Sequence, residues 1–141
     1  MTNLKTSKYI LTDLRLPEEK QKKESDYNKW AKHLLWLDNS VIEGASFFNS
    51  SWYFKPQKDV VLEHSHDFNE IVCFFGSDHN VPYDLGGEIE FWLDGEKHTI
   101  RNSCVIWIPK GLKHCPQSVT KVERPIFHVA IASDAQYSKN E

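Results

Sequence analysis

From residue 41 onward, turn residues divide the sequence into short apolar or alternating segments, and no helical segment of useful length appears. Segments of this kind are typical of β-strands. We predict strands at 45–54, 59–66, 70–75, 88–93, 98–100, 104–108 and 125–132. The strongest turn signal is Asp94-Gly95, because an Asp-Gly pair readily adopts the positive φ angles of a tight hairpin. Without crossover helices the strands must pair antiparallel, so we expect an all-β sandwich, jelly roll or small barrel.

The region before residue 41 has a different character. Residues 16–28 are polar and rich in lysine, which predicts a solvated linker or a short exposed helix, and residues 9–14 have the pattern of an extended arm. Residues 30–37 carry apolar side chains at positions that suit an amphipathic helix and a strand equally well. The sequence leaves that segment undecided.

Size and charge exclude several classes of protein. A chain of 141 residues is expected to form one hydrophobic core. The net charge of −3, with no basic stripe, predicts no nucleic-acid partner. The longest apolar run is 71–75, far shorter than the about 18 residues that span a bilayer, and the amino terminus lacks a signal sequence. We therefore expect no membrane partner, a cytoplasmic location and, because the three cysteines form no CxxC pair, reduced thiols.

Two histidines, His64 and His66, lie two positions apart in a strand-like run, and Glu70 follows four residues later. Alternation along a strand places both imidazoles on one face, together with Val60 and Leu62, pointing toward the interior. A short polar turn then allows the carboxylate to return to the same place. Two imidazoles on one buried face favour a metal site.

A second motif supplies a further donor. The run 108–114 closes a strand with Pro109, turns at Gly111 and presents His114. Imidazole and carboxylate donors together suit one divalent transition metal ion, and Fe, Mn, Ni, Zn, Co and Cu all accept this mixture. The predicted ligands are His64, His66, Glu70 and His114.

These two motifs resemble those of the cupin superfamily. Its first motif is similar to His64-Ser65-His66 followed by Glu70, and its second to Pro109-Lys110-Gly111 followed by His114. The resemblance covers residues 41–133 and implies a small antiparallel jelly-roll β-barrel with the metal inside. Residues 1–40 would then be an N-terminal extension packing on the barrel or on a partner, and 134–141 a C-terminal tail. Two departures are an apparent insertion at 77–86 and the absence of a glycine at 101–103, where Asn102 stands.

The strand 70–75 is apolar on both faces. Val72 and Phe74 share the parity of Glu70 and are expected to line the interior as substrate-binding residues. Residues 71, 73 and 75 face the other way and are equally apolar, so that face must also be covered. We expect a homodimer, or coverage by residues 1–40.

Candidates for a protonatable group are fewer. His128 shares a strand row with the small Ala130 and Ala132, which either leaves room for a ligand beside the imidazole or faces solvent or a partner. We name His128 as the candidate catalytic residue, with Tyr83 and His79 of the insertion behind it. The insertion is either a lid over the barrel mouth or a surface loop. Cys115 directly follows a predicted ligand and is expected to point away from the metal if the chain is extended there.

The function predicted from these features is metal-dependent catalysis on a small, anionic, oxygen-rich metabolite. Oxygenase, isomerase, lyase and decarboxylase chemistry all remain open, because the ligands do not choose between them. The alternative is a non-catalytic, metal-dependent small-molecule sensor or binding protein.

Overall fold

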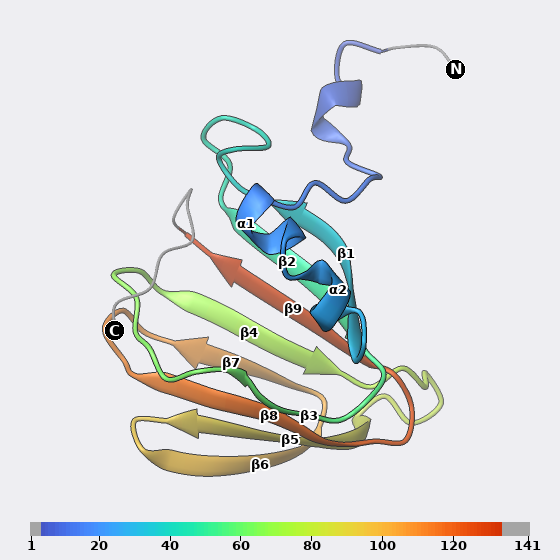
Figure 1. Cartoon of the computed structure of the whole chain (residues 1–141), viewed down its shortest axis with the longest axis vertical. Coiled ribbons are helices and arrows are strands. Elements are labelled where there is room, and N and C mark those ends of the chain that lie inside the picture. The colour runs from blue at the N-terminus through green and yellow to red at the C-terminus, as the bar shows by residue number, and fades with distance from the viewer. Residues whose placement is uncertain (1–3, 134–141) are drawn as a thin grey trace.

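The computed structural model describes residues 4–133 (Figure 1); the predicted tail 134–141 and residues 1–3 lie outside the described residues. The amino-terminal part contains three short helical elements: η1 (Ser7–Tyr9), α1 (Glu18–Gln21) and α2 (Glu24–Tyr27). Nine strands follow: β1 (Ala31–Leu37), β2 (Phe47–Tyr53), β3 (Gln57–Val61), β4 (Glu70–Phe75), β5 (Asp84–Leu93), β6 (Glu96–Asn102), β7 (Cys104–Ile108), β8 (His114–Val122) and β9 (Ile126–Ala132). None of the helices within residues 4–133 has the length and apolar character needed to span a bilayer.

The strands form two antiparallel sheets, which confirms the predicted all-β jelly-roll class (Figure 1). One sheet has five strands in the order β1-β2-β9-β4-β7, and the other has four in the order β3-β8-β5-β6. β9 lies between β2 and β4 although it is far from both in sequence, so non-local pairing holds the centre of the larger sheet together.

The core lies between the two sheets. Its largest fully buried apolar side chains come from both: Phe74, Ile108 and Ile126 from the larger sheet, and Ile89 and Phe91 from the smaller. Period-2 alternation along each strand places these residues inward. Burying such side chains from water is the main favourable term that holds the sheets together.

The undecided segment 30–37 is a strand. β1 pairs with β2 along its length, with an irregularity between His33 and Leu35, so the sheet begins ten residues before the boundary at 41 drawn from the sequence. The segment 16–28, for which a solvated linker and a short exposed helix were the alternatives, contains the short helices α1 and α2. These helices lie beside β1 and β2 and are anchored by buried Leu16 and by Tyr27 (Figure 1).

The observed strands differ from the predicted ones most clearly at β3 and β8. The segment predicted as a strand over 59–66 forms β3 only as far as Val61, so His64 and His66 lie in a connecting segment beyond it. The strand β8 was not predicted at all, because Pro116 and polar residues interrupt its apolar pattern. It is nevertheless the inner neighbour of both β3 and β5.

Candidate metal centre

Backbone pairing brings the two histidine motifs together. His64 and His114 form an isolated antiparallel bridge, with N–O distances of 3.0 Å and 2.9 Å between their main chains. A second hydrogen bond, from the Gly111 amide to the carbonyl oxygen of His66, holds the turn of the second motif against the first. The bridge therefore places residues fifty positions apart in the sequence side by side.

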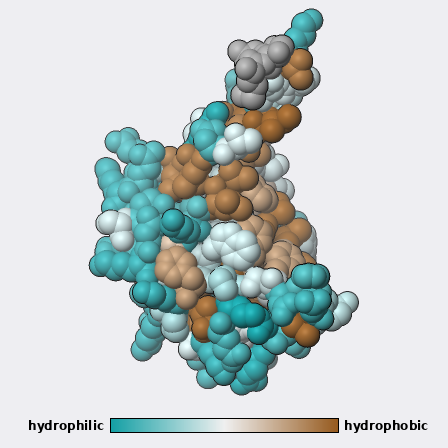
Figure 2. Space-filling view, turned by 90° about the vertical axis from the view of Figure 1, so that its right-hand side faces the viewer, coloured by the Kyte–Doolittle hydropathy of each residue, from teal (hydrophilic) through white to brown (hydrophobic). Residues whose placement is uncertain are grey.

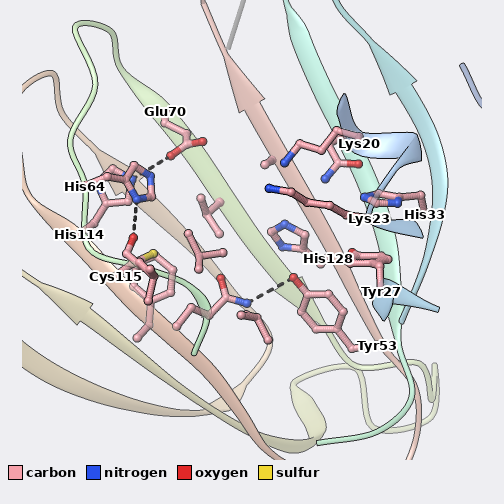
Figure 3. Close-up of a pocket in the computed structure, with 18 of the residues that line it drawn as sticks. Lys20, Lys23, Tyr27, His33, Tyr53, His64, Glu70, His114, Cys115 and His128 are labelled. Carbon is pink, nitrogen blue, oxygen red and sulfur yellow. Dashed lines mark hydrogen bonds and ion pairs between the residues drawn. The ribbon is translucent and has the colours of Figure 1, made fainter. Parts of the chain in front are cut away.

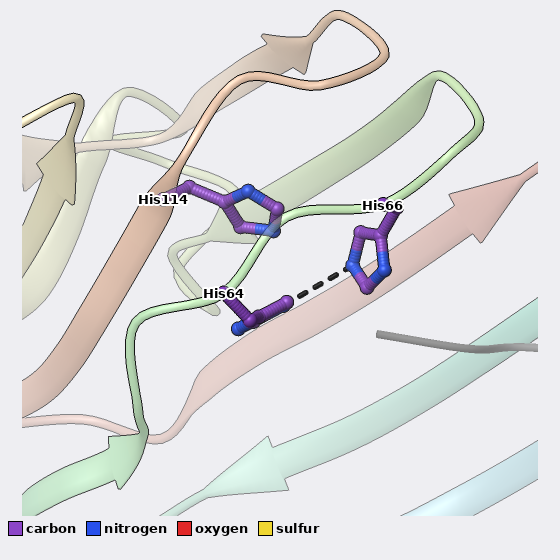
Figure 4. A group of neighbouring side chains, drawn as sticks. All are labelled: His64, His66 and His114. Carbon is purple, nitrogen blue, oxygen red and sulfur yellow. Dashed lines mark hydrogen bonds between the residues drawn. The ribbon is translucent and has the colours of Figure 1, made fainter. Parts of the chain in front are cut away.

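The three imidazoles point toward one another (Figure 4). Nδ1 of His64 donates to the carbonyl oxygen of Leu62 at 2.7 Å, and Nδ1 of His114 donates to that of Leu112 at 2.9 Å. Because a carbonyl oxygen can only accept, the proton resides on Nδ1 and each Nε2 keeps its lone pair for a metal ion. The possible ligand atoms of His64, His66 and His114 all lie within 4.8 Å of one another.

Glu70 adds a carboxylate to this cluster. It begins β4, and its Oε1 lies 3.3 Å from Nε2 of His114 and 3.5 Å from Nε2 of His66. Burial alone would raise the pKa of Glu70, but the close approach of the His114 and His66 imidazoles outweighs burial and lowers the pKa to about 2. The carboxylate is therefore held as an anion in a buried position, where it is 3% exposed.

The donor atoms fit a divalent transition metal. Nε2 of His64 and Nε2 of His66 are 3.1 Å apart. Two nitrogen donors bound at about 2.1 Å to one ion lie about 3.0 Å apart at a right angle and about 3.4 Å apart at a tetrahedral angle. Among the described residues, Nε2 of His114 is also buried without a hydrogen-bond partner, as expected of an atom that serves a ligand not present in the protein alone.

A cavity of about 680 Å³ opens beside this cluster (Figure 3). His64, Glu70 and His114 form part of its wall, and the inner face of β2 and β9 forms another part. Its volume is within the range of small-molecule sites. The histidine and glutamate side chains can therefore contact a ligand of several carbon atoms bound in the cavity.

His128 lies on the cavity wall, as the ligand-side alternative for its strand row requires. Its ring stacks on Tyr53 and on Phe74, with centroid distances of 5.3 Å and 5.1 Å. Nδ1 donates to the carbonyl oxygen of Cys73 at 3.2 Å, which leaves Nε2 as a proton acceptor. Burial lowers the pKa of His128 to about 4, against the smaller raising effect of that hydrogen bond, so the ring is neutral near pH 7.

Of the other residues predicted near the pocket, some line the cavity and one does not. Val72 and Ala130 line the cavity, whereas Phe74 is fully buried and packs behind His128 instead. Cys115 was expected to point away from the metal if the chain is extended there. Its φ of 71° shows that the chain is not extended at this residue, and Cys115 lines the cavity.

The insertion does not reach the cavity. It joins the end of β4 to the start of β5, whereas Glu70 stands at the opposite end of β4. Tyr83 is 78% exposed, and neither it nor His79 lines the cavity. The structure thus places both secondary candidates for the protonatable group away from the metal cluster.

Several cavity residues were missed because they belong to two segments without a predicted site role: 16–28, interpreted as a solvated linker or a short exposed helix, and the undecided 30–37. Lys20, Lys23, Glu24 and Tyr27 come from α1, α2 and the residues between them, and His33 comes from β1. Chain order gives no signal that a polar helical segment will cover a pocket built by strands. The concentration of lysines at 20–23 is the one sequence feature that marked this stretch.

No protein-family model matches the sequence, and no curated protein sequence matches it. Solved structures share the fold. A protein described as having a double-stranded β-helix domain, from Klebsiella pneumoniae, aligns with a TM-score of 0.51 over 91% of this chain and 90% of its own length, at 13% identity. An oxalate oxidase aligns with a TM-score of 0.52 over 78% of this chain at 14% identity. The chain has a cupin fold. Another oxalate oxidase structure, in complex with glycolate, aligns with a TM-score of 0.52 over 77% of this chain at 15% identity. The cupin barrel described here spans about half the length of these oxalate oxidases, 54% and 53%.

Proposed function

We propose that this cupin protein binds one divalent transition metal ion and acts as a metal-dependent enzyme on a small, anionic, oxygen-rich metabolite. The observation that carries the proposal is the convergence of buried donor atoms on the wall of one cavity. The proposed ligands are His64, His66, Glu70 and His114.

The charge of the site supports an anionic ligand. One divalent ion and one carboxylate leave a net charge of about +1 in a wall where Glu70 is 3% exposed, and exclusion of water strengthens attraction of an anion. When bound, the ion would polarise a carbonyl or carboxylate oxygen and stabilise negative charge that develops on it. The acid named for the oxalate oxidase complex, glycolate, is a small oxygen-rich anion of this class.

His128 is the proposed catalytic residue. Its neutral imidazole has an acceptor nitrogen in the cavity, and its orientation is fixed by stacking and by the Cys73 carbonyl. A positioned base that is unprotonated near pH 7 can accept a proton from a bound hydroxy or enolisable acid. The His128 imidazole favours an enzyme over a sensor, because a sensor needs the metal but no proton acceptor.

Metal analysis tests the proposal directly. The protein, purified without oxygen and chelators, is expected to hold about one transition metal ion per chain by elemental analysis. His66→Ala and His114→Ala should lose the ion while keeping the β-sheet circular dichroism spectrum. The matched control is His98→Ala, since His98 is exposed on β6 and outside the cluster. Full occupancy in both cluster variants would overturn the assignment.

The outer face of the five-stranded sheet supports a homodimer. Residues that point away from the core include Val105 and Trp107, which are 65% and 57% exposed, with Ile131 and Phe75 nearby at 38% and 37%. On the side of the molecule shown in Figure 2, hydrophobic residues run through the middle of the surface, with hydrophilic residues at the left and below. The helices α1 and α2 do not cover this face, because they line the cavity on the opposite side of the sheet.

The size of this face matches a second copy of the chain. Five strands about 4.8 Å apart and about 20 Å long give this face an area of roughly 480 Å² on each subunit. Two such faces together would bury close to the total of about 1,000 Å² that a specific interface requires. We propose that two subunits pack through it. Light scattering should give a dimer for the parent and for a His98→Lys control, and a monomer for Trp107→Lys. A monomeric parent at tens of micromolar would overturn the homodimer.

A further inference from the structure

The cavity has two cationic poles. The proposed metal centre forms the first, and the side chains of Lys20 and Lys23 form the second, at the rim built by α1 and the start of α2. Residues three apart on a helical turn share one face. Both lysine side chains extend into the cavity, toward the side on which Glu70 and His64 lie (Figure 3).

The rim is held against the barrel by specific contacts. The side-chain amide of Gln21 donates to the carbonyl oxygen of Leu16 at 2.8 Å, and Leu16 is itself buried in a cluster with Trp36. The Tyr27 hydroxyl donates to Ser51 of β2 at 2.8 Å. These contacts place the lysine-bearing turn over the cavity rather than in solvent.

Two carboxylates also line the cavity near this rim. Glu24 accepts a hydrogen bond from Nδ1 of His33 at 2.6 Å, and Glu63 is exposed beyond the end of β3. No ion pair of Lys23 is found within residues 4–133. A charged amine at a cavity mouth is a donor for carboxylate or phosphate oxygens.

The cavity wall also carries an unsatisfied acceptor. Oδ1 of Asn49 is buried and lacks a hydrogen-bond partner among the described residues, and Asn49 lines the cavity next to Ala130 of β9. Buried amide oxygens are rarely left unpaired in a protein with its ligand bound. A hydroxyl on the ligand would satisfy this atom.

We propose that the ligand of this cavity is a dianion, with one acidic group at the metal centre and the second, a carboxylate or a phosphate, held by Lys20 and Lys23. The inference rests on the proposed function, because the first acidic group needs the metal. A volume of about 680 Å³ accommodates a ligand longer than a two-carbon acid. Lys20 and Lys23 are then specificity-determining residues and not catalytic ones.

Binding to cobalt(II)-loaded protein tests the dianion. Butyrate, glutarate and 4-phosphonobutyrate are titrated by calorimetry, and the cobalt absorption bands report whether each acid reaches the metal. The parent should bind glutarate or the phosphonate about tenfold more tightly than butyrate, and the stronger of the two identifies the second group. Salt at 0.5 M should reduce this preference, because exposed charges are screened.

Variants separate the lysines from the metal. Lys20→Gln/Lys23→Gln should bind butyrate with the same cobalt spectrum as the parent but lose the preference for dianions. Lys22→Gln is the matched control, because Lys22 is exposed in the same turn and does not line the cavity. Equal binding of butyrate and both dianions by the parent, with a normal cobalt response, would overturn the dianion and leave the proposed function standing. No cobalt binding, or no spectral response to any acid, would overturn the proposed function and the dianion with it.

Discussion

The candidate metal centre and the lysine rim face the same cavity, but the protein builds them in different ways. At the centre, buried side chains are oriented by the barrel backbone, through hydrogen bonds to Leu62 and Leu112 and a bridge between two motifs. At the rim, Lys20 of α1 and Lys23, which directly precedes α2, are exposed, and these two four-residue helices are attached by a few side-chain contacts. A rigid centre is suited to hold a reacting group, and a lightly attached rim is suited to discriminate between ligands and to let them pass.

The largest expected effect is at the centre. Glu70→Ala should weaken metal affinity roughly 1,000-fold, since a direct ligand matters more than the outer partners whose loss costs about 10- to 100-fold. Competition with a chromogenic chelator measures the affinity. Glu63→Ala, which removes an exposed carboxylate next to His64, is the control and should leave affinity within about twofold. Unchanged affinity in Glu70→Ala would remove the carboxylate from the ligand set.

Loss of the proton acceptor comes next. His128→Ala should lower turnover of any small acid that the parent converts by about 100-fold or more, while metal content and affinity for the acid stay close to the parent. Proton NMR of substrate consumption over a panel of small hydroxy and keto acids measures it. Turnover equal to the parent would make His128 a structural residue. A parent that binds acids but converts none would favour the sensor over the enzyme.

The same histidine should make the metal-free protein sensitive to acid. Its pKa is about 4 when folded and about 6.5 when unfolded, so the unfolded state takes up the proton first as pH falls. Stability is therefore complete above about pH 6.5 and declines toward pH 4, by about 2 kcal/mol between pH 7 and pH 5. Urea unfolding with a chelator present should show this decline in the parent and about 2 kcal/mol less of it in His128→Phe. Parallel pH profiles would contradict a buried neutral imidazole.

The smallest expected effect concerns the attachment of the rim. Tyr27→Phe removes the hydrogen bond to Ser51 and should lower the free energy of unfolding by about 1 kcal/mol. Hydrogen exchange should accelerate at residues 18–27, whereas the strands around the metal centre keep their protection. Faster exchange at both places would show that the rim and the centre form one cooperative unit, and the contrast between them would disappear.

The fold class and the metal cluster could be predicted because their signals are local. Strand alternation, the Asp94-Gly95 turn and the spacing of His64, His66 and Glu70 are properties of neighbouring residues. The predicted backbone conformation around the two histidines was less accurate. β3 ends at Val61 and Leu62 is 68% exposed, so the two histidines converge through the bridge to His114 rather than through the strand alternation that predicted them.

Errors arose where backbone conformation departs from the regular pattern. Cys115 has a positive φ, so the extended chain on which the expected direction of its side chain depended is not present. β8 forms despite Pro116 because its neighbours β3 and β5 supply the pairing. Val72 and Phe74 share one parity, yet only Val72 reaches the cavity, since depth along the strand decides which inward side chain borders empty space.

The sequence by itself determined the all-β class, the four candidate ligands and the apolar character of both faces of β4, because these depend on side-chain type and on spacing along the chain. Only the tertiary structure decided what shares the cavity with the metal centre. Lys20, Lys23 and His128 are brought there from segments about a hundred residues apart by the pairing of β2 with β9 and by the docking of α1 and α2. Such contacts arise from the burial of apolar surface and the pairing of distant strands, which leave no periodic trace in the residues that they bring together.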